Sequence, residues 1–576
     1  MKYYNKIFNK VAKLTLMLTV ALTSASCVDT VILPDDKIVD DDYWQNKEDV
    51  ANVITNAYKT LLGTENMRNM IAWGSFRSDE MKYSDDPKAT NKIRESLVEL
   101  YSHQPTSENS FTSWAALYSC INYCNIVLEK APAVREIDPN YTEGYYLADR
   151  SQMLALRAMC YFYLIRTFRD VPITTEAYMS DSQEMNIPQS APGVIIDQCI
   201  SDLLEAEPTA ISSTAYGDWR DKGYITKNAV WALLADMYLW RASVKHDISD
   251  YQNCVTYCDK IINAMDEAYF ERDKEESIYH LFEATKYYTE IYGTNGQNSR
   301  ESIFELQFNS SNSNEGLCQM YYKFENENSS SGFVKATPIY CTPGLTNPYN
   351  TVNGTVKDYR YYQNAFGVGV DNDTYDIRKF VAVSGVGTQA AQNRSGDRTY
   401  KEYNQNWIIY RLTDVMLMKA EALVQIGGQE DPNLTPATNE NLKAAFELVK
   451  KVNTRACGGE ETMKDNNYKD KNVLEMDMLV LEERARELCF EGKRWFDLLR
   501  FNYRHIKEDP QYYSTMAQRG NGGPANDENM KILASRKYTS PGPMMARLLM
   551  EANLYMPINK NELAVNNNLV QNPAYQ

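Results

Sequence analysis

Residues 409–423 read IYRLTDVMLMKAEAL and carry the clearest helical signal in the chain. Apolar residues recur in this stretch at steps of three and four: Ile409, Leu412, Met416, Ala420 and Leu423. That spacing places all five on one face of an α-helix. We therefore expect a helix over residues 407–424 with one buried face.

The same periodicity predicts further helices, and they come in pairs. The expected pairs are 111–130 with 145–168, 193–206 with 226–242, and 407–424 with 442–454. Another stripe predicts one more helix through Leu481, Ala485, Leu488, Gly492, Trp495 and Leu499. Small residues such as Ala232 and Ala420 let neighbouring helices approach closely, as in helix-hairpin repeats. The period is too irregular to establish a tetratricopeptide array from the sequence alone.

The sequence pattern changes between about residues 266 and 406. Polar clusters fill 309–314, 326–332 and 384–396, and short β-prone pieces lie at 302–306 and 379–383. Residues 508–543 also contain many glycines and prolines, which interrupt regular secondary structure. We expect a mainly α fold in one domain, residues 27–576. A helical scaffold (about 43–265 and 407–505) would carry a loop-rich insertion with short strands (about 266–406) and a loop-rich C-terminal tract (about 506–576).

The first 27 residues have the pattern of an export signal. Four lysines precede an apolar run at 14–22, and Ser24, Ala25 and Ser26 lead into Cys27. The run is too short for a comfortable membrane span, so we predict a signal peptide over residues 1–26. Small residues before a cysteine are typical of a lipobox, which predicts lipidation of Cys27 and membrane anchoring. The alternative is an ordinary signal peptide with an incidental cysteine.

The net charge and the cysteine content argue against some kinds of partner and of site. Removal of the signal takes away four lysines and no acid, so the net charge moves from −17 to −21. Such a charge argues against nucleic acid or an anionic membrane surface as the main partner. Most of the 11 cysteines lie in apolar helical patterns and are expected to be buried. With only four scattered histidines, we expect no metal and no cofactor.

Several motifs together resemble one family. The N-terminal ones are Asp42-Tyr43-Trp44, then Trp114 with Tyr118, Asn122 and Asn125, then Ala155-Leu156-Arg157-Ala158 and Asp170-Val171-Pro172. The C-terminal ones are residues 410–422, the run EGKRWFDLLR at 491–500, Met556-Pro557-Ile558 and Gln571-Asn572-Pro573. In this order they resemble the SusD/RagB-like outer-membrane nutrient-binding lipoproteins.

The resemblance implies a fold, a location and a partner. The fold would be tetratricopeptide-like helix pairs behind a loop-rich ligand face. The protein would be lipid-anchored at the outer membrane, exposed at the cell surface, and would deliver oligosaccharides or polysaccharides to a TonB-dependent, SusC-like barrel. A peptide-binding, RagB-like receptor is the alternative. One departure is that only Asp29 follows Cys27 closely, where surface-exposed relatives often carry an acidic stretch.

The charged residues in the C-terminal signatures are expected to be scaffold. Arg411, Asp414, Glu421, Arg494 and Asp497 lie beside apolar stripes, so we predict paired charges that join helix to helix. Trp495 should pack in the same seam. The alternative is a charged catalytic cluster.

Catalytic motifs are not found in the sequence. It contains no Gly-rich phosphate loop, no His-Glu-x-x-His and no Gly-x-Ser-x-Gly. A surface glycan hydrolase is the less favoured alternative, because 77 acids give many chance carboxylate pairs. The run Asp371-Asn372-Asp373 with Asp376 lacks the glycine and glutamate of a calcium loop, so we expect a turn. We therefore predict a binding protein and no enzyme.

Tyrosine dominates the aromatic content, with 42 Tyr against 17 Phe and 8 Trp. Such rings stack on the C–H face of a sugar and keep a polar group for hydrogen bonds. The predicted ligand-binding residues are Trp73, Arg77 and Asp79 in one segment, and Tyr287, Tyr288, Tyr292, Tyr321 and Tyr322 in the insertion. The alternative is that these tyrosines pack beneath the long loops.

Overall fold

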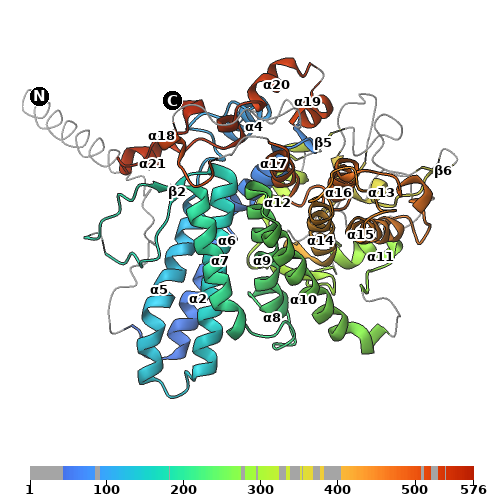
Figure 1. Ribbon diagram of the computed structural model, residues 1–576. Helices are drawn as coiled ribbons and strands as arrows, with labels where there is room; N and C mark the ends of the chain where they lie inside the picture. Colours follow the sequence, from blue (N-terminus) through green and yellow to red (C-terminus); the bar gives the residue numbers. More distant parts are fainter. Residues whose placement is uncertain are drawn as a thin grey trace, which may run out of the picture.

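Long helices standing side by side form most of the molecule (Figure 1). The computed structural model describes residues 43–576 except 85–90, 181, 274–278, 294–295, 323–331, 338–350, 353–354, 367–375, 382–403, 507–510, 520–529 and 539. Cys27 and the signal peptide therefore lie outside the described residues, as do Asp371, Asn372 and Asp373.

The longer helices account for nearly half of the described chain. They are α2 (Lys47–Thr60), α3 (Thr64–Ile71), α4 (Lys92–Tyr101), α5 (Ala115–Ile137), α6 (Glu143–Phe168), α7 (Pro192–Ala206), α9 (Lys227–Lys245), α10 (Ile248–Asp273), α11 (Ala284–Ile291), α14 (Leu412–Gly427), α15 (Glu440–Ala456), α16 (Val473–Glu487) and α17 (Arg494–His505). The shorter ones are η1 (Ala72–Phe76), η2 (Glu207–Thr209), α8 (Arg220–Gly223), α12 (Glu315–Tyr321), α13 (Arg360–Asn364), η5 (Asp465–Asn467), α18 (Met516–Arg519), α19 (Lys531–Lys537), α20 (Gly542–Leu548), η7 (Glu551–Leu554), α21 (Lys560–Val565) and η8 (Pro573–Tyr575).

Strands are short and pair in twos, all antiparallel. The pairs are β1 (Met81–Tyr83) with β5 (Val334–Ala336), β2 (Val171–Pro172) with β3 (Gln189–Ser190), β4 (Ser302–Leu306) with β10 (Trp407–Arg411), β6 (Thr351–Val352) with β7 (Thr355–Val356), and β8 (Ala365–Phe366) with β9 (Asp376–Ile377). The pairings β1–β5 and β4–β10 tie the insertion to both halves of the scaffold.

The long helices stack in sequence order, as helix-hairpin repeats do. The contacts run α2–α5–α6–α7–α9–α10–α14, and α14 then packs on both α15 and α16. Neighbouring helices bury each other's apolar faces, and α6 is buried without interruption from Ser151 to Phe168. The expected mainly α fold is confirmed. Among the described residues, no helix is both long enough and apolar enough to cross a bilayer.

The helix expected over residues 407–424 begins later than predicted. Residues Trp407–Arg411 form β10, which pairs with β4 across Trp407↔Leu306 and Arg411↔Ser302, and α14 starts at Leu412. Aromatic and β-branched residues at 407–410 favour a strand once a partner strand is available. The helical periodicity was therefore misleading for the first five residues.

The stripe from Leu481 to Leu499 is also not one helix. Helix α16 ends at Glu487 and α17 begins at Arg494, because Phe490 and Gly492 have positive φ values of 65° and 72°. The turn between them lies directly against η1: a Cβ atom added to Gly74 would overlap the backbone of Gly492. This close approach needs glycine at residue 74, and the positive φ explains glycine at residue 492.

One of the two expected strand segments in the insertion is wrong. Residues 302–306 form β4 as predicted, whereas residues 379–381 form a turn in which Phe380 has a φ of 69°. Lys379 is drawn inward there and donates to the backbone carbonyls of Glu487 and Cys489 and to Glu491. These polar contacts override the β propensity of the segment.

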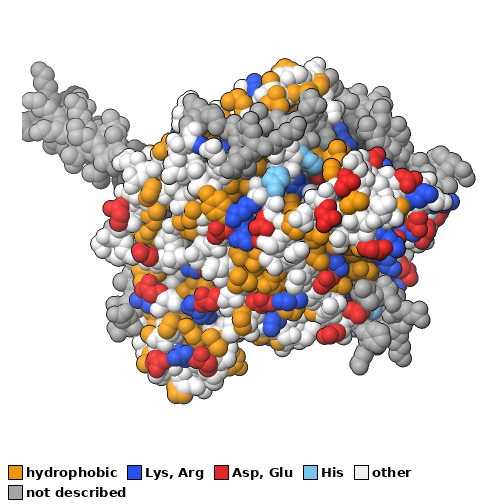
Figure 2. All heavy atoms as spheres, in the orientation of Figure 1, with side chains coloured by type: hydrophobic (Ala, Val, Ile, Leu, Met, Phe, Trp, Pro, Cys, Tyr) orange, Lys and Arg blue, Asp and Glu red, His pale blue; other side chains and the backbone are white. Residues whose placement is uncertain are grey.

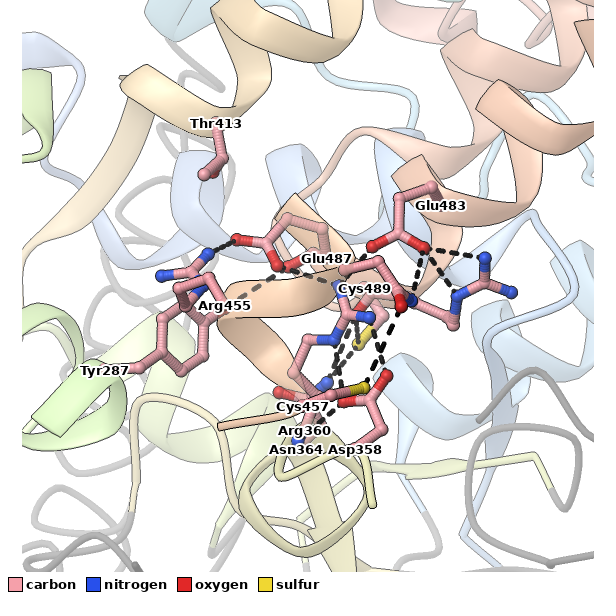
Figure 3. Close-up of polar contacts among 12 residues, drawn as sticks. Tyr287, Asp358, Arg360, Asn364, Thr413, Arg455, Cys457, Glu483, Glu487 and Cys489 are labelled. Carbon is pink, nitrogen blue, oxygen red and sulfur yellow. Dashed lines mark hydrogen bonds and ion pairs between the residues drawn. The ribbon is translucent and has the colours of Figure 1, made fainter. Parts of the chain in front are cut away.

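A buried charge cluster holds the insertion against α16 (Figure 3). We define it as Asp358, Arg360, Arg411, Arg455, Glu483 and Glu487. The Glu487 carboxylate accepts hydrogen bonds from Arg360 (2.9 Å), Arg411 (2.7 Å) and Arg455 (2.5 Å) and is fully buried. Burial acts to raise its pKa, but the three guanidinium groups lower that pKa well below its ordinary value.

The other signature charges are paired in the same manner. Glu421 accepts from Arg500 and Arg504, Asp414 pairs with Arg484 and Lys493, and Asp497 pairs with Arg484 and Arg500. Trp495 is 0% exposed, beneath the guanidinium of Arg77 at 4.4 Å from its ring. The predicted scaffold role of these residues is confirmed, because each charge has a buried partner on another element.

Candidate functional site

A polar face at the start of α5 organises one end of the helical layer. Trp114, Tyr118, Asn122 and Asn125 follow one another at steps of four, four and three, so their side chains share a face. Tyr118 donates to the carbonyl oxygen of Pro172 (2.6 Å), and Asn125 donates to that of Glu176 (2.8 Å). This face therefore binds the backbone of the segment that follows α6.

Asn122 holds that segment with both ends of its amide. Its Nδ2 donates to the carbonyl oxygen of Tyr178 (2.9 Å), and its Oδ1 accepts from the Tyr178 N–H (2.8 Å). Tyr161 of α6 similarly exchanges two 2.9 Å hydrogen bonds with the backbone of Thr174. On the far side, Asn566 donates to the carbonyl oxygen of Ile187 (2.9 Å). Residues 172–180 and 182–187 are thus held against α5, α6 and the end of α21.

These elements enclose a hollow of about 440 Å³, which we call the α5–α21 hollow. Figure 1 shows α21 and β2 at the same end of the α5–α6 pair. The hollow is lined by Trp114, Tyr118, Ile121, Asn122, Pro172, Thr174, Tyr178, Ser182, Gln183, Glu184, Met185, Asn186, Ile187, Glu562, Val565, Asn566 and Leu569. Its size is that of a pocket for a small organic ligand, about 300 to 1,000 Å³.

The buried part of the lining is aromatic, and its exposed part is polar. Trp114 and Tyr118 are almost fully buried, and their rings meet edge to face at 5.4 Å. Ser182, Glu184 and Asn186 are exposed, and Tyr178, Gln183 and Asn566 are half-buried. The amides of Gln183 and Asn566 are hydrogen-bonded within the protein, so the exposed side chains of Ser182, Glu184 and Asn186 are the polar groups open to a ligand. Such groups around an aromatic floor can bind a ligand that is rich in hydroxyl groups and carries an apolar face.

Glu562 is the one nearly buried charge in this hollow. Burial raises its pKa above the ordinary value, and the Trp114 indole N–H acts in the opposite direction. That N–H is itself buried and makes no hydrogen bond of normal geometry. Among the described residues, no basic side chain acts on Glu562, and the lining of the hollow includes no lysine or arginine.

The first predicted ligand segment belongs to the interior. Trp73 is 0% exposed and donates its indole N–H to the Phe111 carbonyl oxygen (2.8 Å). Arg77 is buried over Trp495 and donates to the carbonyl oxygen of Leu554 (2.7 Å). Asp79 accepts both hydrogen bonds of a bidentate pair with Arg494 (2.9 and 3.0 Å). All three side chains are thus paired inside the protein, and none of them lines the α5–α21 hollow.

Most of the predicted ligand-binding tyrosines in the insertion are also buried. Tyr287, Tyr288, Tyr292 and Tyr321 are at most 2% exposed. Tyr292 donates to Glu491 (2.9 Å), Tyr288 to the carbonyl oxygen of Arg378 (2.7 Å) and Tyr321 to that of Phe490 (2.8 Å). Only Tyr322 is half-buried. The alternative reading, in which tyrosines pack beneath loops, therefore describes the first four.

The α5–α21 hollow was missed from the sequence, although a signal for it exists. Trp114, Tyr118 and Asn122 were noted as a motif, and their helical spacing places an aromatic-polar stripe on one face. Glu562 and Asn566 lie one helical turn apart near the C-terminus. Nothing in the sequence shows that these two stretches, more than 400 residues apart, line one cavity.

Metal chemistry finds no support in the part of the chain that the structure describes. No group of three or more His, Cys, Asp or Glu side chains there has the arrangement of a metal site. The nine cysteines among these residues are all buried. The expectation that cysteines in apolar helical patterns are buried is confirmed for Cys120, Cys124, Cys254 and Cys258.

Comparison with known proteins gives the family. The SusD family matches residues 348–575, and a second family, described as "Starch-binding associating with outer membrane", matches residues 33–239. The chain belongs to the SusD/RagB family. Both matched stretches contain the motifs quoted above for this resemblance.

Relatives and solved structures match this chain over most of its length. The chain is 25% identical to SusD-like protein P38 of Formosa agariphila over 525 residues, which cover 85% of this chain and 91% of that protein. It is similar in fold to a SusD superfamily protein of Bacteroides vulgatus (TM-score 0.63, 18% identity, 92% of this chain and 100% of that one). A SusD superfamily protein of Parabacteroides distasonis is also similar (TM-score 0.62, 22% identity, 92% and 99%).

Proposed function

We propose that this SusD-like protein captures oligosaccharides or polysaccharides at the cell surface and passes them to a TonB-dependent, SusC-like transporter in the outer membrane. Membership of the SusD/RagB family supports this role, as does the description of the N-terminal match as starch-binding and associated with the outer membrane. The partner follows from the family and not from any surface seen in the structure.

The α5–α21 hollow is the observation that carries the ligand class. It combines an aromatic floor with amide and hydroxyl groups at the rim, and no basic side chain lines it. A neutral saccharide has matching features: C–H faces for the rings and hydroxyl groups for the amides. On the described surface of the face shown in Figure 2, basic and acidic side chains are interspersed and no broad basic patch appears, which agrees with a ligand other than nucleic acid.

Retention of the mature protein in gels that contain different polysaccharides tests this proposal. We expect at least one neutral glycan to slow the wild type. Val565→Trp should reduce that retention, because Val565 is 48% exposed at the rim and an indole there would occupy part of the hollow. Affinity should fall about tenfold or more, the effect of losing roughly 1.4 kcal/mol of contacts.

Ile137→Trp is the matched control for that substitution. Ile137 is 57% exposed at the last residue of α5, whereas the hollow lies at the first turns of the same helix. It should therefore leave retention unchanged. If no glycan retards the wild type and a peptide library is bound, the RagB-like peptide receptor replaces this proposal. Release of reducing ends from a glycan would show a hydrolase.

We also infer that Cys27 is lipidated and that residues 1–26 are removed. The motif in the sequence supports this, since Cys27 lies outside the described residues. A fatty-acid analogue fed to cells should label the wild type and leave Cys27→Ala unlabelled, because the thiol is the acceptor. Equal labelling of both, with the same membrane fractionation, would contradict lipidation at Cys27.

A further inference from the structure

The α5–α21 hollow contains an acid that lacks the cation found beside several other buried carboxylates. Glu562 is 9% exposed, and within the described part of the chain only burial and the Trp114 indole shift its pKa, with no basic side chain beside it. Glu421, by comparison, lies between Arg500 and Arg504, and Asp79 is held by Arg494. A carboxylate that is removed from water without a partner is destabilising. This arrangement leaves a place for a positive group supplied by a ligand.

The surroundings of Glu562 suit an ammonium group. Trp114 and Tyr118 line the same hollow, and Tyr178, whose backbone is held by Asn122, adds a third aromatic ring to the lining. Aromatic rings attract cations through their electron-rich faces, and a nearby carboxylate adds direct attraction. The indole N–H of Trp114 lowers the pKa of Glu562 and so favours the charged form of this carboxyl. The second acid of the lining, Glu184, lies exposed at the rim.

We propose that the α5–α21 hollow recognises a saccharide that carries a free amino group, with its ammonium beside Glu562 and its ring against Trp114 and Tyr118. The inference rests on the proposed function and makes its ligand more specific. Glu562 acts as the specificity-determining residue. Saccharides with carboxylate or sulfate groups are excluded, because no lysine or arginine in the lining would pair with them.

Two tetrasaccharides that differ only in this group test the proposal. One is the tetramer of β-1,4-linked glucosamine, and the other is its fully N-acetylated form. Calorimetry at pH 6 should show that the wild type binds the amine form about tenfold more tightly, which is within the range of a desolvated cation–π and carboxylate contact. Glu562→Gln keeps the shape of the side chain and should reduce the preference to about twofold or less.

Glu184→Gln is the matched control, since it removes the same charge from an exposed position at the rim. It should keep the preference, because solvent screens an exposed charge. Thermal melting of both variants verifies that each is folded. Equal wild-type affinity for the two tetramers, or an unchanged preference in Glu562→Gln, would overturn the proposal.

The remaining outcomes separate this inference from the proposed function. If neither tetramer binds but a neutral glycan still retards the protein in gels, amine recognition is wrong and glycan capture stands. If no glycan of any kind binds, glycan capture fails as well. If only a lysine-containing peptide binds, and Glu562→Gln abolishes that binding, the saccharide proposal is overturned in favour of a peptide.

Discussion

Gly74→Ala is expected to destabilise the protein by about 3 kcal/mol or more, the upper range for forcing extra volume into a packed core. The added methyl group would overlap the carbonyl of Gly492. Neither backbone can move easily, because η1 is fully buried and Gly492 sits in the tight turn between α16 and α17. The Gly492 N–H also donates to Ser75 (3.0 Å), which joins the two segments at this point.

Thermal and urea unfolding measure this effect, and Gly542→Ala provides the control. Gly542 lies in α20 where an added methyl group meets no atom, so alanine there should leave stability unchanged or raise it by about 0.5 kcal/mol. A Gly74→Ala variant as stable as the wild type would show that η1 and the 488–493 turn do not pack as described.

Glu487→Gln is expected to cost about 3 to 5 kcal/mol, as for the loss of one partner from a buried ion pair. Glutamine keeps the shape of the side chain but leaves the guanidinium groups of Arg360, Arg411 and Arg455 without their shared carboxylate. The pKa of Glu487 lies well below its ordinary value in the folded protein. Its stabilising charge is therefore present at neutral pH and is lost only as pH falls toward that lowered pKa.

Glu440→Gln removes the same charge from the surface and serves as the comparison. The side chain of Glu440 is 91% exposed in the first turn of α15, so its replacement should change the free energy of unfolding by less than about 0.5 kcal/mol. Urea titration of both variants measures the difference. Equal stability of Glu487→Gln and the wild type would mean that the arginines find other partners.

Helical periodicity was sufficient to predict most of the scaffold. The expected helix at 145–168 is α6 (Glu143–Phe168), and that at 193–206 is α7 (Pro192–Ala206), each correct within two residues. These helices bury a face against their sequence neighbours, so local pattern and tertiary packing agree. The segments 407–411 and 488–493 failed because their conformation depends on β4 and on η1, which are distant in sequence.

The residues that line the α5–α21 hollow could not be found in this way. A tryptophan such as Trp73 contributes the same aromatic signal to a sequence whether it lies in the core or in a pocket. Its burial depends on Phe111 and Phe168, which it contacts in the folded chain. The α5–α21 hollow likewise requires α5, the segment 172–187 and α21 to come together, and no local pattern encodes that meeting.

Calorimetry tests the central claim most directly. A neutral oligosaccharide, taken from a glycan that retards the protein, is titrated into the mature wild type and into Val565→Trp. We expect binding by the wild type with an affinity that hardly changes between low and high salt, because an uncharged ligand gains nothing from the negative net charge. Val565→Trp should bind about tenfold more weakly, or not at all, at an unchanged melting temperature. Equal binding by both proteins, or strongly salt-dependent binding of a basic peptide with no heat from any neutral glycan, would contradict capture of a saccharide in the α5–α21 hollow.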